Sequence, residues 1–193
     1  QSPTPAPAGA APVAAAPDAS VNYDAGLVRI QVLLDRAHFS PGVIDGYDGE
    51  NVRKALSAYQ RAHNLPVTGL ADDALLTRLE QADAAPALVA YVLREEDVRG
   101  PFVNVPQDLQ DMSRLEQVGY ESAAEATAEK FHMDEDLLRD LNRVKSFDQP
   151  GTVISIANDN VKPVALRAKA LMLEVDKTRK SVRVLADGKL VAA

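Results

Sequence analysis

Hydrophobic residues recur at intervals of three and four in three consecutive stretches between residues 24 and 83, which predicts three short helices. The first apolar face comprises Leu27, Ile30, Leu34 and Ala37, with Leu33 beside it. The second comprises Val52, Ala55, Leu56, Tyr59 and Ala62, and the third Leu75, Leu76 and Leu79. This pattern predicts a small all-α domain with Tyr59 in its core. Asn64 is a plausible left-handed end of the second helix, and Asp72 or Asp73 a plausible start of the third.

The pattern changes after residue 83. The short apolar run ALVAYVL (87–93) and the alternating run TVISIA (152–157) predict two strands. Between them, Ser122 and Glu125 form a capping-box sequence ahead of one helix, and Asp134 can cap a second. The polar segment before Ser122 predicts a loop with a short helix near 109–115. The expected unit is a strand-helix-helix-strand α+β module at 88–159.

The last stretch, 168–193, predicts strand, turn, strand, turn and strand, with a hairpin turn at Asp187-Gly188. Such a small sheet is marginal without a covering layer. We therefore expect these residues to be held loosely or to pair with another chain. The predicted fold class is multi-domain and mainly α: a three-helix bundle, an α+β module and a C-terminal β-hairpin fragment.

The first 23 residues are nearly all Ala, Pro and small polar residues, which predicts a disordered tether. The chain starts at Gln1, with no basic segment leading into an apolar one, as expected of an exported protein after removal of its signal peptide, although an arbitrary starting point in a longer chain would look the same. No apolar run approaches the roughly 18 residues that suggest a membrane span. The expected location is the periplasm or cell envelope.

The charge and the missing cysteine narrow the possible chemistry. A net charge of -7 with scattered Lys and Arg argues against nucleic acid as a partner. The absence of Cys excludes disulfides, thiolate metal sites and a Cys nucleophile within these residues. His38, His63 and His132 fall at predicted helix ends in different modules, unlike the ligands of a zinc site. We expect neither a cofactor nor a metal.

Two acidic turns, Asp45-Gly46 and Asp48-Gly49, raise the alternative of a calcium loop that would include Glu50. An EF-hand loop, however, needs ligands at alternate positions and a glutamate at its end, where this chain has Leu56. The interpretation retained is that both Asp side chains accept backbone N–H groups while both glycines supply positive φ.

The residues Asp45-Gly46-x-x-Gly49, Ala55-Leu56, Tyr59-Gln60 and Leu65-Pro66-x-x-Gly69 together resemble the three-helix peptidoglycan-binding domain of bacterial wall enzymes. The resemblance covers residues 24–83. It implies that the domain binds peptidoglycan. Candidate contacts are Tyr47 and Asn51, which flank the acidic turn, and Gln60.

The segment GYESAAEATAEKFHMDEDLLRDLNRVKSFDQPGTVISIAN (119–158) resembles a LysM domain, with an insertion between the first strand and the first helix. LysM domains bind glycan between the loop before the first helix and the loop after the second. The resemblance therefore adds Tyr120, Glu121, Asn142, Arg143 and Lys145 as candidate glycan contacts.

Residues 168–193 resemble the first strands of an L,D-transpeptidase catalytic domain of the YkuD type. The reaction of that family uses a Cys thiolate assisted by a His, and both would lie beyond Ala193. Without Cys this chain is predicted to be inactive by itself and to bind or position only.

Three hypotheses follow. In the first, the chain is the wall-anchoring region of an L,D-transpeptidase, which cross-links peptidoglycan or attaches envelope proteins to it. In the second, it is a non-catalytic scaffold that contacts other envelope proteins or the missing catalytic domain. In the third, it is an autonomous hydrolase or metal protein, which the missing Cys and the unclustered His residues disfavour.

Overall fold

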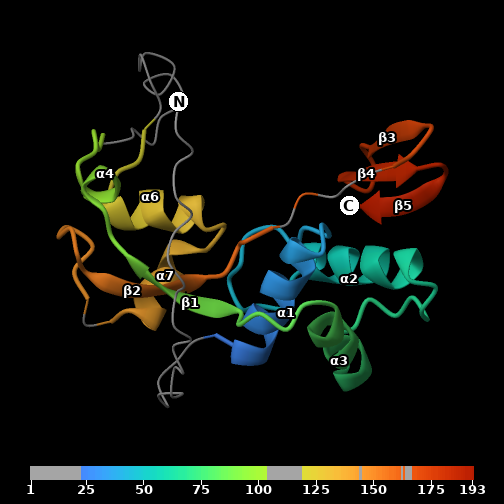
Figure 1. Ribbon diagram of the computed structural model, residues 1–193, viewed down its shortest axis with the longest axis horizontal. Coiled ribbons are helices and arrows are strands. Elements are labelled where there is room, and N and C mark those ends of the chain that lie inside the picture. Colours follow the sequence, from blue (N-terminus) through green and yellow to red (C-terminus); the bar gives the residue numbers. More distant parts are fainter. Residues whose placement is uncertain (1–22, 104–118, 144, 162, 164–166) are drawn as a thin grey trace.

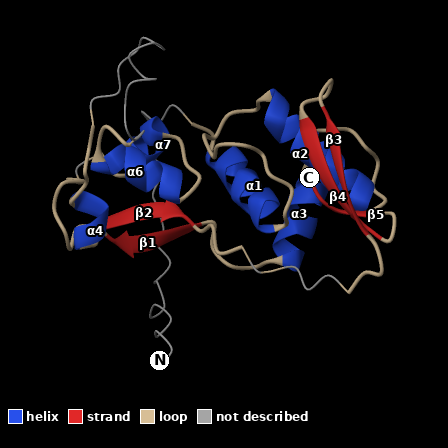
Figure 2. Cartoon of the chain, turned by 90° about the horizontal axis from the view of Figure 1, so that it is seen from above, coloured by secondary structure: helices blue, strands red, loops and turns tan. Residues whose placement is uncertain are grey.

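The computed structural model describes residues 23–103, 119–143, 145–161, 163 and 167–193. The described chain forms a helical bundle, a unit with a two-stranded sheet, and a three-stranded sheet near the C-terminus (Figure 1). Helix α1 lies in the middle of the molecule in both views, between the unit with β1 and β2 and the part that contains α2 and α3 (Figures 1 and 2).

The bundle consists of α1 (Ala25–Arg36), α2 (Glu50–Ala62) and α3 (Asp73–Ala82). The three helices predicted from the periodicity are confirmed. Asp24 and Asp72 cap α1 and α3 by accepting N–H groups of the first turn. Within the described part of the chain, no helix combines the length and the apolar character needed to cross a membrane.

The second unit contains two antiparallel strands and three helices. Its elements are β1 (Leu88–Val92), α4 (Glu95–Val98), α6 (Ala123–Lys130), α7 (Glu135–Leu141) and β2 (Val153–Ala157). The predicted order of strand, helix, helix and strand is present, and α4 is an addition that the sequence pattern did not indicate. The helix expected near 109–115 lies outside the described residues.

Local capping explains why α6 and α7 begin where they do. The Ser122 hydroxyl accepts the N–H of Glu125 at 3.0 Å, as the capping box predicts. The Glu125 carboxylate reaches back to the N–H of Glu121, one residue before the cap. Asp134 accepts N–H groups of the first turn of α7.

The C-terminal sheet has the order β3 (Leu171–Asp176), β4 (Ser181–Ala186) and β5 (Lys189–Ala192). The turn between β4 and β5 is the predicted Asp187-Gly188 pair, with φ of 49° and 78°. Positive φ at both central residues matches the twist of a two-residue hairpin.

One edge of this sheet is attached to the bundle. The N–H of Ser40 donates to the carbonyl of Ala193 at 2.8 Å, and the N–H of Ala193 donates to the carbonyl of His38 at 3.0 Å. Leu190 and Ala193 pack against the core of the bundle. The sheet therefore has a partial covering layer that the sequence did not predict, while the expectation of loose attachment stays a prediction.

Helix α1 contributes to two separate hydrophobic cores. Ile30, Leu33 and Leu34 pack with α2 and α3, as predicted. Val28 and Val32, on another face, pack with the core of the second unit. The prediction of a single buried face on α1 is therefore incomplete, because this helix is buried on two sides.

The loop after α1 also joins the two units. Ile44 is fully buried in the core of the second unit and forms an isolated parallel bridge with Met133. Its N–H donates to the carbonyl of His132 at 2.8 Å, and its carbonyl accepts the N–H of Asp134 at 2.9 Å. The bundle and the second unit are thus joined by backbone hydrogen bonds as well as by a shared core.

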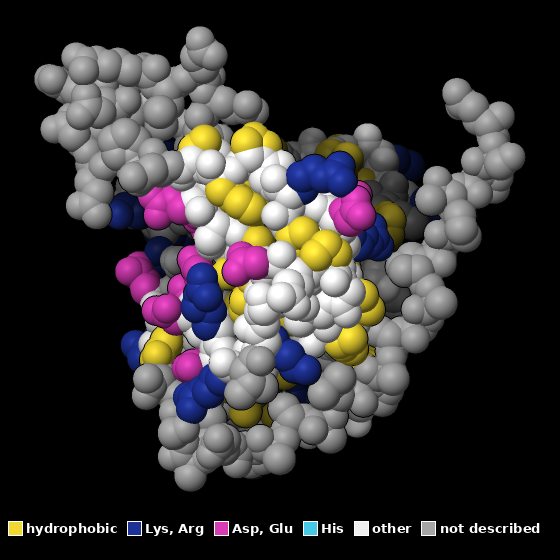
Figure 3. All heavy atoms as spheres, turned by 90° about the vertical axis from the view of Figure 1, so that its left-hand side faces the viewer, with side chains coloured by type: hydrophobic (Ala, Val, Ile, Leu, Met, Phe, Trp, Pro, Cys, Tyr) yellow, Lys and Arg dark blue, Asp and Glu magenta, His cyan; other side chains and the backbone are white. Residues whose placement is uncertain are grey.

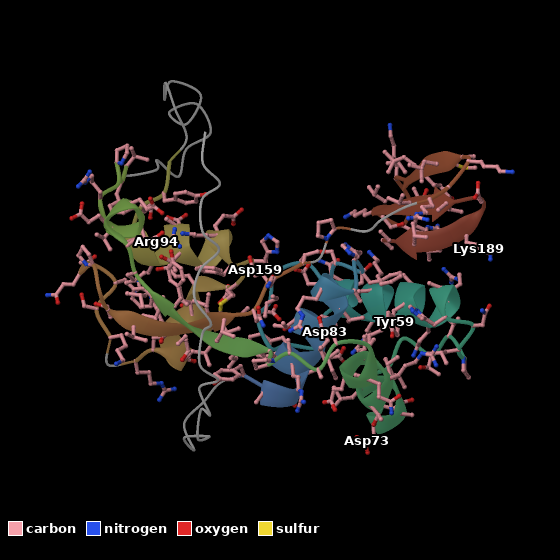
Figure 4. All side chains as sticks on the ribbon, in the orientation of Figure 1. Tyr59, Asp73, Asp83, Arg94, Asp159 and Lys189 are labelled. Atoms are coloured by element: carbon pink, nitrogen blue, oxygen red, sulfur yellow. The ribbon has the colours of Figure 1, made fainter. Side chains whose placement is uncertain are left out.

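A buried cation holds the segment that leads from α3 to β1. The side chain of Arg36 is 2% exposed and forms an ion pair with Asp83. It also donates to the carbonyls of Ala85 and Pro86. Asp83 lies beside α1 near the middle of the molecule (Figure 4). Since a buried charge is costly without partners, this clamp fixes the direction in which the chain enters β1.

A second polar network ties α4 to α6 and β1. The Asp97 carboxylate accepts from the Lys130 ammonium at 2.6 Å, the Tyr91 hydroxyl at 2.7 Å and the N–H of Arg94 at 2.8 Å. Burial raises the pKa of Asp97, but hydrogen bonds from Lys130, Arg94 and Tyr91 outweigh burial and hold this pKa below its ordinary value of 3.8.

Replacement of Asp97 by Asn is expected to lower the free energy of unfolding at pH 7 by about 1–2 kcal/mol, because charge-assisted hydrogen bonds are lost while Lys130 stays partly solvated. The folded-state pKa of Asp97 lies below 3.8, so its stabilisation is complete above that pH and is lost as pH falls through the lower value. Urea unfolding from pH 7 to pH 3 should therefore show the two proteins converging at acid pH.

The matched control is Glu95→Gln, whose ion pair with Arg99 has side chains 74% and 75% exposed. This change should move the stability by no more than about 0.5 kcal/mol. A stability difference between Asp97→Asn and the parent that is unchanged at pH 3 would show that the carboxylate charge is not responsible.

Candidate functional site

The acidic turn after α1 is fixed by hydrogen bonds to one buried side-chain amide, that of Gln31. Gln31 is fully buried, and its Oε1 accepts the N–H groups of Asp45 at 3.2 Å and Gly46 at 2.8 Å. Its Nε2 donates to Oδ1 of Asp45 at 2.7 Å and to the carbonyl of Tyr47 at 3.4 Å. The backbone of the turn is therefore fixed, and the side chain of Tyr47 projects from it.

A second turn repeats this arrangement. Oε1 of Gln60 on α2 accepts the N–H groups of Thr68 and Gly69, both at 2.9 Å. Its Nε2 donates to Oγ1 of Thr68 at 2.9 Å and to the carbonyl of Leu70 at 3.3 Å. The domain thus contains two copies of one helix-and-turn unit, in which Leu70 takes the position of Tyr47. We call them the Gln31 turn and the Gln60 turn.

Each turn requires glycine at its centre. Gly46 has φ of 76°, and a Cβ atom there would lie 2.8 Å from the Cβ of Tyr23. Gly69 has φ of 67°, and a Cβ atom there would lie 2.9 Å from Oγ of Ser57. The left-handed conformation would strain a side chain at either position, and at Gly46 the side chain would also clash with Tyr23.

The second half of the acidic stretch differs from the prediction. Gly49 has φ of -95° and is the N-cap of α2, so it does not supply positive φ. Asp48 pairs with Arg53, with oxygen and nitrogen 2.7 Å apart, instead of accepting a backbone N–H. The expectation for Asp45 is confirmed, since its Oδ1 accepts the N–H of Tyr47 at 2.9 Å.

Two of the expected glycan contacts occupy structural positions. Gln60 is 3% exposed and its amide is engaged in the Gln60 turn. Asn142 is 5% exposed; its Nδ2 donates to the carbonyls of Leu138 and Ser155, and its Oδ1 accepts the N–H of Ser155. Because these amides are buried and satisfied within the chain, the expectation that they face a glycan is corrected.

Tyr47 stands at a hollow between the bundle and α7, and its side chain is 55% exposed. We call this hollow the α7 cleft; its volume is about 500 Å³. It is lined by Tyr23, Asp45, Tyr47, Asp134, Asp136, Leu137, Arg139 and Asp140. Four carboxylates, one guanidinium and two phenols therefore face this space.

Most charged groups of the α7 cleft have local partners. Arg139 pairs with Glu135, and Asp140 pairs with Arg143 at 3.3 Å. Burial raises the pKa of Tyr23, and the charge of Asp140 raises it further. The phenol of Tyr23 therefore stays protonated at neutral pH and can donate a hydrogen bond.

Asn51 lies at a different hollow, between α2 and the turn that joins β3 to β4. We call it the hairpin groove; its volume is about 810 Å³. It is lined by Ser40, Gly42, Glu50, Asn51, Arg53, Lys54, Ala55, Ser57, Ala58, Arg61, Thr178, Arg179, Lys180, Ser181, Val182, Arg183 and Ala193. The structure thus separates Tyr47 from Asn51, which the sequence placed together beside one turn.

The remaining candidates belong to the second unit. Arg143 adjoins the α7 cleft through its ion pair with Asp140. Tyr120, which is 43% exposed, precedes α6 together with Glu121, and exposed Lys145 follows α7. These three residues line neither hollow. Their contact with a glycan stays a prediction.

The histidines take structural positions at helix ends. His63 stacks on Tyr59 with ring centroids 4.1 Å apart, and His132 lies 3.2 Å from the carboxylate of Asp35. Tyr59 is 2% exposed, which confirms its place in the core. The residues that the structure describes contain no group of three or more His, Cys, Asp or Glu side chains suited to hold a metal ion.

Residues 24–79 match the protein family described as "Putative peptidoglycan binding domain". The match spans α1, α2 and most of α3, and so includes both the Gln31 turn and the Gln60 turn. No curated protein matches the chain. The chain therefore contains a peptidoglycan-binding domain in its N-terminal half, which supports a peptidoglycan-binding role and an association with the cell wall.

Replacement of Gln60 by Leu is expected to lower the free energy of unfolding by about 2–4 kcal/mol, because the N–H groups of the Gln60 turn lose their acceptor. The same substitution at exposed Gln81 is the control and should change stability by no more than about 0.5 kcal/mol. Chemical unfolding of both variants measures the difference. Equal stabilities would mean that the turn does not depend on the amide.

Proposed function

We propose that this chain is the wall-anchoring region of an exported L,D-transpeptidase of the YkuD type, which acts on peptidoglycan in the periplasm or cell envelope. The observation that carries the proposal is the peptidoglycan-binding domain at residues 24–79. Its first turn presents an exposed tyrosine at a cleft large enough for a sugar-sized ligand.

The chemistry of the α7 cleft suits the neutral glycan strand of peptidoglycan. Sugar hydroxyl and acetamido N–H groups can donate to carboxylates such as that of Asp136, and the ring of Tyr47 offers an apolar face with a polar tip. The acidic lining would repel an anionic ligand at the same place. We therefore assign the glycan strand, and not its peptides, to this cleft.

The second unit is proposed to be a LysM-like partner of the peptidoglycan-binding domain. Support comes from its strand-helix-helix-strand order and from its helix α7, which forms one wall of the α7 cleft. Tyr120 and Glu121 before α6, and Arg143 and Lys145 after α7, are proposed to extend the contact with glycan. Both units would then hold one strand.

The C-terminal sheet is proposed to be the first part of the catalytic domain. Its strands carry large hydrophobic side chains that are 48–66% exposed, as expected of a surface that packs on further structure. These side chains are Leu171, Met172, Leu173, Val175 and Val182. Because the 193 residues contain no Cys, the acyl transfer of this family would not be carried out by them.

The same exposed apolar residues favour a second candidate function, a scaffold that binds other envelope proteins. In that case the contact with a protein partner, and not with the wall, would position the chain. The two candidates differ in one property that can be measured, namely binding of the purified chain to sacculi without any other protein.

The substitution Tyr47→Ala should weaken binding to purified sacculi about two- to twelvefold, since one aromatic contact contributes roughly 0.5–1.5 kcal/mol. The control is Leu70→Ala, the equivalent position of the Gln60 turn, which lines neither hollow although it is 59% exposed. It should bind like the parent. Co-sedimentation at several protein concentrations gives both affinities.

No enrichment of the parent chain on sacculi, relative to an unrelated acidic protein, would contradict the wall-anchoring function and favour the scaffold. Equal weakening by Tyr47→Ala and Leu70→Ala would remove the α7 cleft as the site. Circular dichroism and unfolding curves of each variant show whether a loss of binding reflects a loss of fold.

A further inference from the structure

The hairpin groove concentrates positive charge in a protein whose net charge is -7. Six basic side chains line it against one acidic side chain, that of Glu50. The basic residues are Arg53, Lys54, Arg61, Arg179, Lys180 and Arg183. They come from α2 and from the β3–β4 hairpin, which lies over α2 in Figures 1 and 2.

The cations of the hairpin groove differ in how closely they are paired with carboxylates. Arg53 and Lys54 have close acidic partners, Asp48 and Glu50, each at 2.7 Å. Arg179 pairs with Asp176, and Arg183 pairs with both Glu174 and Asp176, but each of these nitrogen–oxygen distances is 3.8 Å, which is too long for a hydrogen bond. Arg61 has no ion pair among the described residues.

The distribution of charge elsewhere makes this groove distinctive. The α7 cleft is lined mainly by carboxylates. On the end of the molecule formed by the second unit, basic and acidic side chains are interspersed among hydrophobic ones (Figure 3). The two hollows therefore differ in sign, and they would select different parts of one ligand.

We propose that the hairpin groove binds the carboxylate groups of peptidoglycan stem peptides. The inference rests on the proposed wall-binding function and adds a second, chemically distinct contact to it. Guanidinium groups bind carboxylates through paired hydrogen bonds, and Arg61, Arg179 and Arg183 supply such donors from two sides.

The size and walls of the groove fit a short peptide. Its volume lies in the range of pockets for small ligands, which is roughly 300–1,000 Å³. Val182, which is 48% exposed, gives it apolar surface beside the cations, which suits the methyl groups of alanine residues. A long polyanion is disfavoured, because the rest of the chain carries an excess of negative charge.

The groove is also composite. Its α2 wall belongs to the segment that matches the peptidoglycan-binding family, while Thr178–Arg183 lie outside that segment. The C-terminal sheet is anchored beside α2 by the hydrogen bonds of Ala193 with His38 and Ser40. Stem recognition therefore depends on a part of the chain that the family alone does not provide.

A direct test titrates the whole chain with a soluble stem tripeptide that has free carboxylates and with its fully amidated analogue. The test variant is Arg61→Glu with Arg179→Glu, both of which are exposed positions. The control variant, Arg99→Glu with Lys189→Glu, changes the net charge equally and lies outside the groove.

The parent chain and the control should bind the tripeptide and show weak or no binding of the amidated analogue. The test variant should bind the tripeptide at least about tenfold more weakly, because two cations that attract its carboxylates are replaced by two carboxylates that repel them. Absence of tripeptide binding by the parent, or equal affinity of the two variants, would overturn the inference. Binding of inorganic phosphate as tightly as the tripeptide would also overturn it.

A second arm separates this inference from the proposed function. Sacculi are compared with glycan strands from which an amidase has removed the stem peptides. If the stems contribute, the parent should bind intact sacculi several-fold more tightly than bare glycan, and the test variant should lose that difference. Equal binding to both polymers would overturn stem recognition while leaving wall anchoring intact, whereas binding to neither would contradict wall anchoring itself.

Discussion

The structure depends on the burial of α1 from two sides. Ile30, Leu33 and Leu34 belong to the core of the bundle, while Val28 and Val32 belong to the core of the second unit. A buried polar side chain on such a helix needs hydrogen-bond partners within the chain, and the amide of Gln31 finds them in the turn that follows. The Gln31 turn is therefore fixed by the same helix that joins the two units, and the α7 cleft forms at their junction.

The polar groups of the domain divide into two classes. Buried amides such as those of Gln31 and Gln60 shape the backbone and have no capacity left for a ligand. Exposed side chains such as that of Tyr47 project from that backbone, and their identity can differ between turns, as Leu70 at the equivalent position shows. Recognition can therefore change without disturbing the fold, because the scaffold and the contact side chain are different residues.

Much of the local structure could be predicted from the sequence, since helical periodicity and capping residues act over a few positions. The second buried face of α1 could not, because Val28 and Val32 contact residues about a hundred positions away. Gln60 and Asn142 were misassigned for a related reason: a polar residue near a turn looks the same whether its amide faces water or the backbone. The repeated order of a helical Gln, a proline and a glycine turn, although at different spacings, was the signal that could have identified both amide-held turns. The basic character of the hairpin groove arises only when the β3–β4 hairpin is placed over α2, which no local pattern specifies.

Because α1 is buried on two sides, the segment that matches the family is not the whole of the unit that shares a hydrophobic core. The matched segment ends at residue 79, yet Val28, Val32 and Ile44 within it are covered by the second unit. If the segment were excised or transplanted, those side chains would form an apolar surface open to solvent, and self-association would follow. Gene rearrangements that move this wall-binding segment alone would therefore be disfavoured, and the two units are expected to be inherited as a pair.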